Sequence, residues 1–135
     1  MKLIAHRGNI KGRNKKEENN PDYIRTAIKK GFDAEIDVWF HDGLYSGHDE
    51  AVYDLDLDFL LEFHKSLWIH CKNIESLEFL TSIPQLNVFW HQTDSYTLTS
   101  HGYIWTYPHT RVCRKSVIVC TDSRFARYQN CYGIC

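Results

Sequence analysis

The first 72 residues contain five short groups of polar residues whose types suit chemistry on a phosphate ester. In chain order they are His6-Arg7-Gly8, Glu18-Asn19, Glu35-Ile36-Asp37, His48-Asp49 and His70-Cys71-Lys72. A phosphodiester carries a negative charge that repels nucleophiles. An enzyme must therefore neutralise that charge, activate a nucleophile and protonate the leaving alkoxide. Imidazoles, carboxylates, an arginine and a lysine can perform these tasks.

Two carboxylates and a histidine on neighbouring predicted strands are placed to hold a metal ion. Side chains alternate along a strand, so Glu35 and Asp37 share one face, and His70 and Lys72 share a face on the next strand. Hard cations such as Mg²⁺ and Ca²⁺ prefer oxygen ligands, whereas a mixed site with His70 also accepts Mn²⁺ or Zn²⁺. We predict a divalent metal ion bound by Glu35, Asp37 and His70, with Mg²⁺ or Ca²⁺ favoured.

Each group also has a simpler interpretation when taken alone. His6-Arg7-Gly8 can be a turn that closes a strand, Glu35 and Asp37 the solvated face of an edge strand, and His48 a loop histidine. Their joint order, each group at the end of a predicted strand or in the loop after it, favours a common site instead.

The ordered set resembles the glycerophosphodiester phosphodiesterase family. The family pattern runs His-Arg-Gly, Glu-Asn, Glu-x-Asp, His-Asp and Glu-x-Lys along the first strands of a (β/α) barrel, and four of these five elements match directly. The fifth departs, because His70 stands where the family carries the glutamate of Glu-x-Lys. The resemblance covers residues 1 to about 73 and is loose thereafter.

The resemblance and the chemistry together imply a role for each matching residue. By resemblance, His6 activates the nucleophile, which can be the substrate's own adjacent hydroxyl, and His48 protonates the leaving group. Arg7 and Lys72 suit phosphate binding. The resemblance makes Glu18 a metal ligand or a partner of one, and Asp49 the residue that orients His48. The expected substrate is a glycerophosphodiester or a related small phosphodiester.

The second half of the chain offers two weaker candidates for substrate binding. His91 ends a predicted strand, and Trp105 lies on one face of the next strand. A polar group and an aromatic wall there can line the pocket, although aromatic residues at strand spacing more often belong to a core.

Strand and helix signals alternate along the chain, which is typical of βα units. Helices are expected after Asn20, Asp56 and Asn73, each a favourable N-cap. The expected strands are 2–7, 34–40, a short extended segment over 44–47, 67–72, 87–91, 103–107, 116–120 and 132–135, with only brief connecting segments over 94–100 and 123–130. A complete (β/α)₈ barrel needs about 250 residues. We therefore expect an α/β fold in the form of a reduced or incomplete (β/α) TIM-type barrel.

Length and composition limit the remaining possibilities. With 135 residues, 43% of them hydrophobic, the chain can bury one core, so we expect a single domain over 1–135. The net charge of −1 argues against a nucleic-acid partner. No apolar run approaches about 18 residues and the N-terminus begins directly with a strand, which predicts no membrane span and a cytoplasmic location.

Three functions from different classes are compatible with these patterns. The first is metal-dependent hydrolysis of a small phosphodiester by histidine acid–base catalysis. The second is a barrel without catalytic activity that binds a phosphorylated ligand, suggested by the short chain and by His70. The third is an interaction module that forms a homo-oligomer through an exposed barrel edge.

Overall fold

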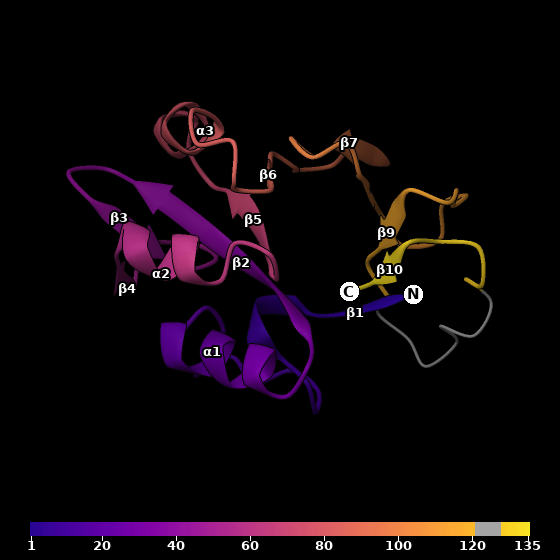
Figure 1. Cartoon of the computed structure of the whole chain (residues 1–135), viewed down its shortest axis with the longest axis horizontal. Helices are drawn as coiled ribbons and strands as arrows, with labels where there is room; N and C mark the ends of the chain where they lie inside the picture. Colours follow the sequence, from indigo (N-terminus) through magenta and orange to yellow (C-terminus); the bar gives the residue numbers. More distant parts are fainter. Residues whose placement is uncertain (121–127) are drawn as a thin grey trace.

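The computed structural model describes residues 1–120 and 128–135, which contain ten strands, three α-helices and one 3₁₀ turn (Figure 1). The strands are β1 (Lys2–Ala5), β2 (Asp33–Phe40), β3 (Leu44–Ser46), β4 (Tyr53–Leu55), β5 (Leu67–Cys71), β6 (Val88–Phe89), β7 (Tyr96–Leu98), β8 (Ile104–Thr106), β9 (Ser116–Ile118) and β10 (Gly133–Ile134). The helices are α1 (Pro21–Lys29), α2 (Leu57–Glu62) and α3 (Ile74–Thr81), and η1 (His6–Gly8) is the 3₁₀ turn.

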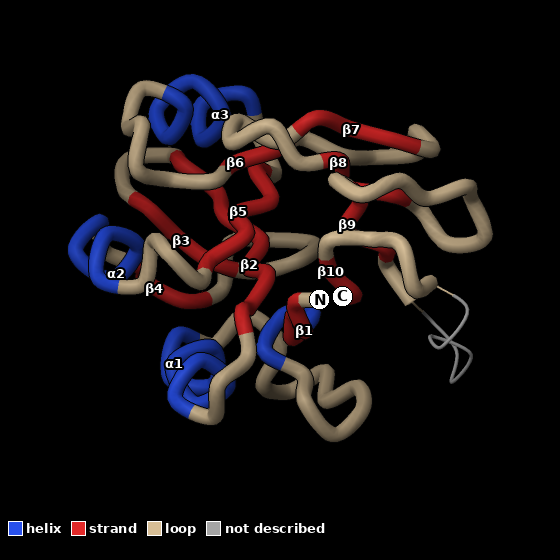
Figure 2. Tube along the Cα trace, turned by 45° about the vertical axis from the view of Figure 1, so that its right-hand side comes forward, coloured by secondary structure: helices blue, strands red, loops and turns tan. Residues whose placement is uncertain are grey.

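The strands join into one mixed sheet. Seven of them are parallel, in the order β6-β5-β2-β1-β10-β9-β8, and β7 continues the sheet antiparallel to β8. The long strand β2 pairs with β5 along one edge, and with β1 and then the antiparallel β3–β4 hairpin along the other. The pairing of β1 with β10 brings the two chain ends together (Figure 2).

The expected α/β fold with a reduced or incomplete (β/α) barrel is wrong, because the sheet is mixed and does not close. No strand pairing joins β6 to β8. The segment between β7 and β8 meets β6 instead, through hydrogen bonds from Ser100 N to Val88 O at 2.8 Å and from Val88 N to Ser100 Oγ at 3.0 Å. The strands of the second half are two or three residues long, and all three α-helices lie over the first half (Figure 1). Closure of a barrel requires longer strands with a continuous stagger.

The expected local elements are largely confirmed. Asn20, Asp56 and Asn73 each accept a hydrogen bond from a backbone N–H in the first turn of the helix that follows. The first strand ends earlier than expected, at Ala5, and β4 and β7 were not expected. The connecting segment expected over 123–130 lies mostly outside the described residues.

The two faces of the sheet carry different side chains. One face packs its aliphatic residues, including Ile36 and Ile69, beneath the helices. The opposite face carries an aromatic cluster around Trp68, Phe89 and Trp105. Because side chains alternate along β2, its acidic residues project on this second face, away from the helices. No helix in the described part of the chain is long and apolar enough to cross a membrane.

Candidate metal centre and adjoining cleft

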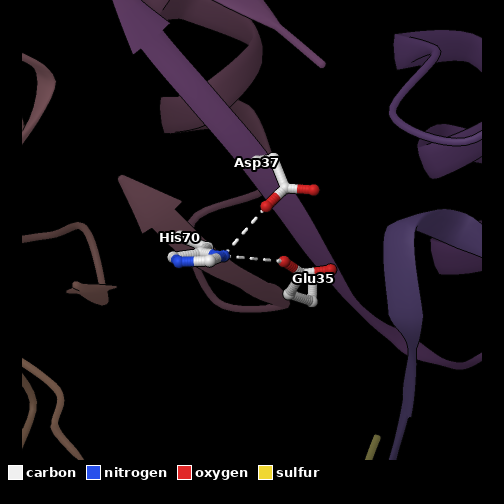
Figure 3. Close-up of side chains that lie close together, drawn as sticks. All are labelled: Glu35, Asp37 and His70. Atoms are coloured by element: carbon white, nitrogen blue, oxygen red, sulfur yellow. Dashed lines mark ion pairs between the residues drawn. The ribbon is translucent and has the colours of Figure 1, made fainter. Parts of the chain in front are cut away.

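Glu35, Asp37 and His70 meet on the face of the sheet opposite the helices (Figure 3). In the register of β2 and β5, Asp37 lies directly beside His70. His70 Nδ1 is 2.8 Å from Asp37 Oδ1 and 3.8 Å from Glu35 Oε1. One donor atom from each of the three residues lies within 4.8 Å of the others, a spacing that one cation can bridge. The structure therefore brings the three predicted metal ligands together.

The hydrogen bond on the far side of the His70 ring makes the trio suitable for a cation. His70 Nε2 lies 2.8 Å from the backbone oxygen of His91, which can only accept, so Nε2 carries the proton. In the neutral ring Nδ1 then presents a lone pair to Asp37 Oδ1, and two acceptors at 2.8 Å repel each other. A proton on Nδ1 or a metal ion between the atoms removes this repulsion. A backbone carbonyl behind the distal nitrogen is the usual arrangement of a metal-binding histidine.

The two carboxylates are fully buried and differ in their electrostatic surroundings. Burial and then the charge of Asp37 raise the pKa of Glu35 well above its usual value. Burial raises the pKa of Asp37 as well, but contact with His70 and the charges of Arg7 and Lys72 outweigh it and hold that pKa below its usual range. Asp37 Oδ1 is buried without a hydrogen bond of acceptable direction. Such an oxygen is a natural ligand for a cation.

The turn after β1 fixes Arg7 beside both carboxylates. Arg7 adopts a left-handed conformation (φ 54°), and its backbone N–H donates to Glu35 Oε2 at 3.0 Å. Its Nε lies 3.0 Å from Asp37 Oδ2. Gly8 follows at φ 87°, where a Cβ would lie 2.7 Å from the Tyr23 ring, so this position requires glycine. Lys72 adds a cation, its Nζ 3.6 Å from Asp37 Oδ1.

Glu18 supports Arg7 and is not one of the three candidate metal ligands, Glu35, Asp37 and His70. Its carboxylate accepts from Arg7 Nη1 at 3.3 Å, from Asn9 Nδ2 at 3.1 Å and from Arg13 Nε at 3.2 Å. These donors lower its pKa despite the opposing effect of burial. The structure therefore places Glu18 as the residue that orients Arg7, and its direct metal ligation has no geometric support.

Asn19 is a site residue that sequence reasoning left without a role. Its Nδ2 donates to Asp37 Oδ2 and its Oδ1 accepts from the Asp37 backbone N–H, both at 2.9 Å. It is fully buried and left-handed (φ 66°), a conformation that asparagine tolerates better than most residues. The Glu-Asn element of the family pattern could have pointed to Asn19. The structure shows that Asn19 orients the Asp37 carboxylate.

His6 and His48 line one open cavity of about 640 Å³ together with Arg7 and Glu18. His6 Nε2 is 3.8 Å from Glu35 Oε2. The His6 side chain is 39% exposed; packing around the rest of the ring and the charge of Arg7 lower its pKa to about 4. His48 Nδ1 is 2.6 Å from Asp49 Oδ1, as expected for an orienting carboxylate. The cavity thus holds both candidate proton-transfer groups, and it is linked to the Glu35–Asp37–His70 group, which does not itself line it, through His6 and Arg7.

The two weaker candidates are not at the cleft. Trp105 is 4% exposed and stacks on Phe89 at 4.5 Å within the aromatic cluster, so it is a core residue. The His91 ring stacks on Tyr107 and its Nε2 lies 2.7 Å from Asp94 O. His91 contributes to the site by holding His70, through its backbone oxygen and an edge-on contact between the two rings.

Compared with protein-family models, with curated proteins and with solved structures, the chain shows no match. The site geometry and the resemblance of the short sequence groups therefore carry the functional argument.

Proposed function

We propose that this protein is a metal-dependent phosphodiesterase that hydrolyses a glycerophosphodiester or a related small phosphodiester. The observation that carries the proposal is the buried Glu35–Asp37–His70 cluster, in which His70 Nδ1 and an unbonded Asp37 oxygen face each other beside a cavity lined by two histidines. A bound divalent cation would polarise a phosphoryl oxygen and offset the substrate's charge.

The protein's own residues would carry the proton transfers. Burial lowers the pKa of His6 and so favours the neutral imidazole, which can accept the proton of the attacking hydroxyl or water. As the new P–O bond forms, the P–O bond to the leaving alcohol breaks, and His48 donates a proton to the departing oxygen. Asp49 holds His48 in position. Lys72 is available to stabilise charge on the phosphate.

Binding of a phosphorylated ligand without cleavage is a second candidate, favoured by the pairing of Arg7. Two of the nitrogens of the Arg7 guanidinium already contact Asp37 and Glu18. Fewer of its N–H groups can therefore bind a phosphate than we expected from the sequence. In this alternative Glu35, Asp37 and His70 bind a cation, and the cation binds the phosphorylated ligand. This alternative predicts that the protein binds metal and phosphate but cleaves no diester.

Metal-induced thermal stabilisation tests the cation site directly. A ligand at 100 times its Kd stabilises the native state by about 2.7 kcal/mol, so Mg²⁺, Ca²⁺, Mn²⁺ and Zn²⁺ titrated in turn should raise Tm of the wild type. The double variant with Glu35→Ala and Asp37→Ala should lose this response. Asp33→Asn is the matched control, because Asp33 is a buried carboxylate of the same strand that bonds Lys2 and Trp68 instead. Unchanged metal affinity in the double variant would reject the site.

A panel of diesters then separates the two functions. The metal-loaded wild type should release an alcohol from at least one glycerophosphodiester. His6→Ala and His48→Ala should each lower kcat/KM by about 10²–10⁴. Metal and phosphate binding without cleavage of any diester would establish the binding function instead.

A further inference from the structure

The cavity lined by His6 and His48, called the catalytic cavity below, adjoins two others. On the side of His48 it shares Arg13, Glu18 and His48 with a cavity of about 210 Å³. On the opposite side, at the ends of β9 and β10, it shares Cys120 and Cys135 with a third cavity of about 460 Å³. A ligand with its phosphate in the catalytic cavity therefore has room on both sides.

The two flanking cavities differ in chemistry. The one beside His48 is lined mainly by polar and charged residues, including Lys15, Asp49 and Glu50. The one beside Cys135 is lined mainly by apolar residues, namely Leu3, Ala5, Ile10, Phe32 and Ile134. Leu3 and Ile134 are partners in the register of β1 and β10, so they lie side by side on the outer face of the sheet. This is the face that the helices cover over β2 and β5, and the cluster beneath the helices includes Ala5 of β1.

The apolar cavity is an unusual surface to leave exposed. Leu3 is 51% exposed although its neighbour Ala5 is buried. The cavity volume falls within the range of about 300–1,000 Å³ typical of small-molecule sites. Its continuity with the catalytic cavity, through Ile4, Asn9 and Gly12 as well as the two cysteines, indicates that one ligand can occupy both.

We propose that the substrate is an amphipathic phosphodiester with a single aliphatic chain, whose chain occupies the apolar cavity along β1 and β10 while its polar alcohol lies beside His48. This inference rests on the proposed function, because it takes the phosphate to lie in the cavity lined by His6 and His48. The polar alcohol is then the leaving group, and it lies next to His48, which protonates it. The aliphatic chain stays attached to the phosphate after cleavage.

Binding of a chain-bearing phosphodiester tests the inference independently of turnover. The probes are decylphosphocholine, kept below the concentration at which it forms micelles, and glycerophosphocholine, which has the same head group without the chain. Wild-type metal-loaded protein should bind decylphosphocholine at least about tenfold more tightly, the gain expected from burying roughly two methylene groups. Kd values from calorimetry give this ratio.

Leu3→Asp should reduce the ratio of the two affinities to less than about threefold, because a carboxylate in the apolar cavity opposes burial of the chain. Leu98→Asp is the matched control, because Leu98 is also an exposed strand leucine, 69% exposed on β7, and lies in none of the three cavities. This control should retain the wild-type ratio. A circular dichroism spectrum like that of the wild type confirms that each variant is folded.

The outcomes separate this inference from the proposed function. Cleavage of glycerophosphocholine together with equal affinity for both probes overturns the chain site and leaves the phosphodiesterase standing. A Leu3-dependent preference for decylphosphocholine with no cleavage of any diester supports the chain site and overturns the phosphodiesterase. A wild-type dimer that Leu3→Asp converts to a monomer, measured by sedimentation, would assign the apolar face to a second copy and overturn the chain site.

Discussion

At the scale of single residues, position 70 would set which cation the proposed metal site prefers. His70 stands where the glycerophosphodiester phosphodiesterase pattern has a glutamate. The group of Glu35, Asp37 and His70 therefore carries one negative charge fewer than a group with three carboxylates. The His70 ring is nevertheless held as a ligand would be, with Nε2 on the His91 carbonyl and Nδ1 toward two carboxylates. An imidazole favours borderline metals over Mg²⁺ and Ca²⁺.

His70→Glu should therefore shift metal preference toward Mg²⁺ or Ca²⁺ and away from Zn²⁺. Titration of wild type and variant with each metal, followed by the shift in Tm, provides the comparison. His64→Glu serves as control, because His64 lies at the end of α2 and bonds only the Leu61 carbonyl. Identical selectivity orders in the wild type and His70→Glu would mean that His70 packs beside the cation without binding it.

His6 should give the metal-free protein a distinct dependence of stability on pH. Its folded pKa of about 4 is below the ordinary value of 6.5, so between these values the unfolded chain takes up a proton that the folded protein does not. The free energy of unfolding should then fall as pH is lowered through this window. Substitution by glutamine, which cannot titrate, should make that fall smaller.

Urea unfolding of the EDTA-treated protein at pH 7, 6, 5 and 4 measures this effect. The quantity to compare is the decrease between pH 7 and pH 4 in wild type and His6→Gln. His41→Gln is the control, since His41 is exposed on the β2–β3 hairpin away from the cluster. An equal decrease in wild type and His6→Gln would show that His6 does not contribute.

At the scale of secondary-structure elements, Asn73 joins β2 to α3. It caps α3 by accepting from Ser76 N at 3.2 Å, and the same side chain bonds both backbone groups of Phe40, Nδ2 to O at 2.6 Å and Oδ1 from N at 3.1 Å. The cap therefore also anchors the outer end of β2. Asn20, the cap of α1, accepts from Asp22 N but bonds no strand.

Asn73→Ala should destabilise the protein more than Asn20→Ala. Loss of a cap alone costs about 1 kcal/mol, and leaving the partly buried groups of Phe40 without partners adds about 1 kcal/mol or more. Denaturant unfolding should give a decrease of about 2 kcal/mol or more for Asn73→Ala and about 1 kcal/mol for Asn20→Ala. Equal decreases would show that the bonds to β2 add nothing.

The sequence predicted elements whose signals are local. The caps Asn20 and Asn73 and the alternation of Glu35 and Asp37 are set by neighbours within a few residues, and each was confirmed. The missed strands β4 and β7 are short and are defined by their partners β3 and β8, which lie elsewhere in the chain. The burial of Trp105 and the pairing of Glu18 with Arg7 likewise depend on tertiary contacts, which no local pattern specifies.

At the scale of the whole molecule, and within residues 1–120 and 128–135, helices cover one half of the sheet and not the other. The strands β2 and β5 bury their aliphatic face under the three helices, whereas β8, β9 and β10 are short and carry smaller buried clusters (Figures 1 and 2). The sheet does not close into a barrel because of this asymmetry. Strands of two or three residues cannot form a continuous set of strand-to-strand hydrogen bonds from β6 to β8. Glu35, Asp37 and His70 lie on β2 and β5, in the covered half.

This asymmetry predicts unequal local stability, which hydrogen exchange can measure. The amides of Ala34 and Ile69 bond Ser66 O and Asn87 O at 2.8 and 2.9 Å in the covered half, and those of Ile104 and Val119 bond Lys115 O and Thr106 O at 2.9 and 3.0 Å in the other. The bond lengths are alike, so differences in protection report burial and local opening. Ile104 and Val119 should exchange at least about tenfold faster, a difference of about 1.4 kcal/mol in opening free energy. Equal protection of the four amides would show that the open sheet unfolds as one cooperative unit. Glu35, Asp37 and His70 would then gain no rigidity from the half of the sheet in which they lie.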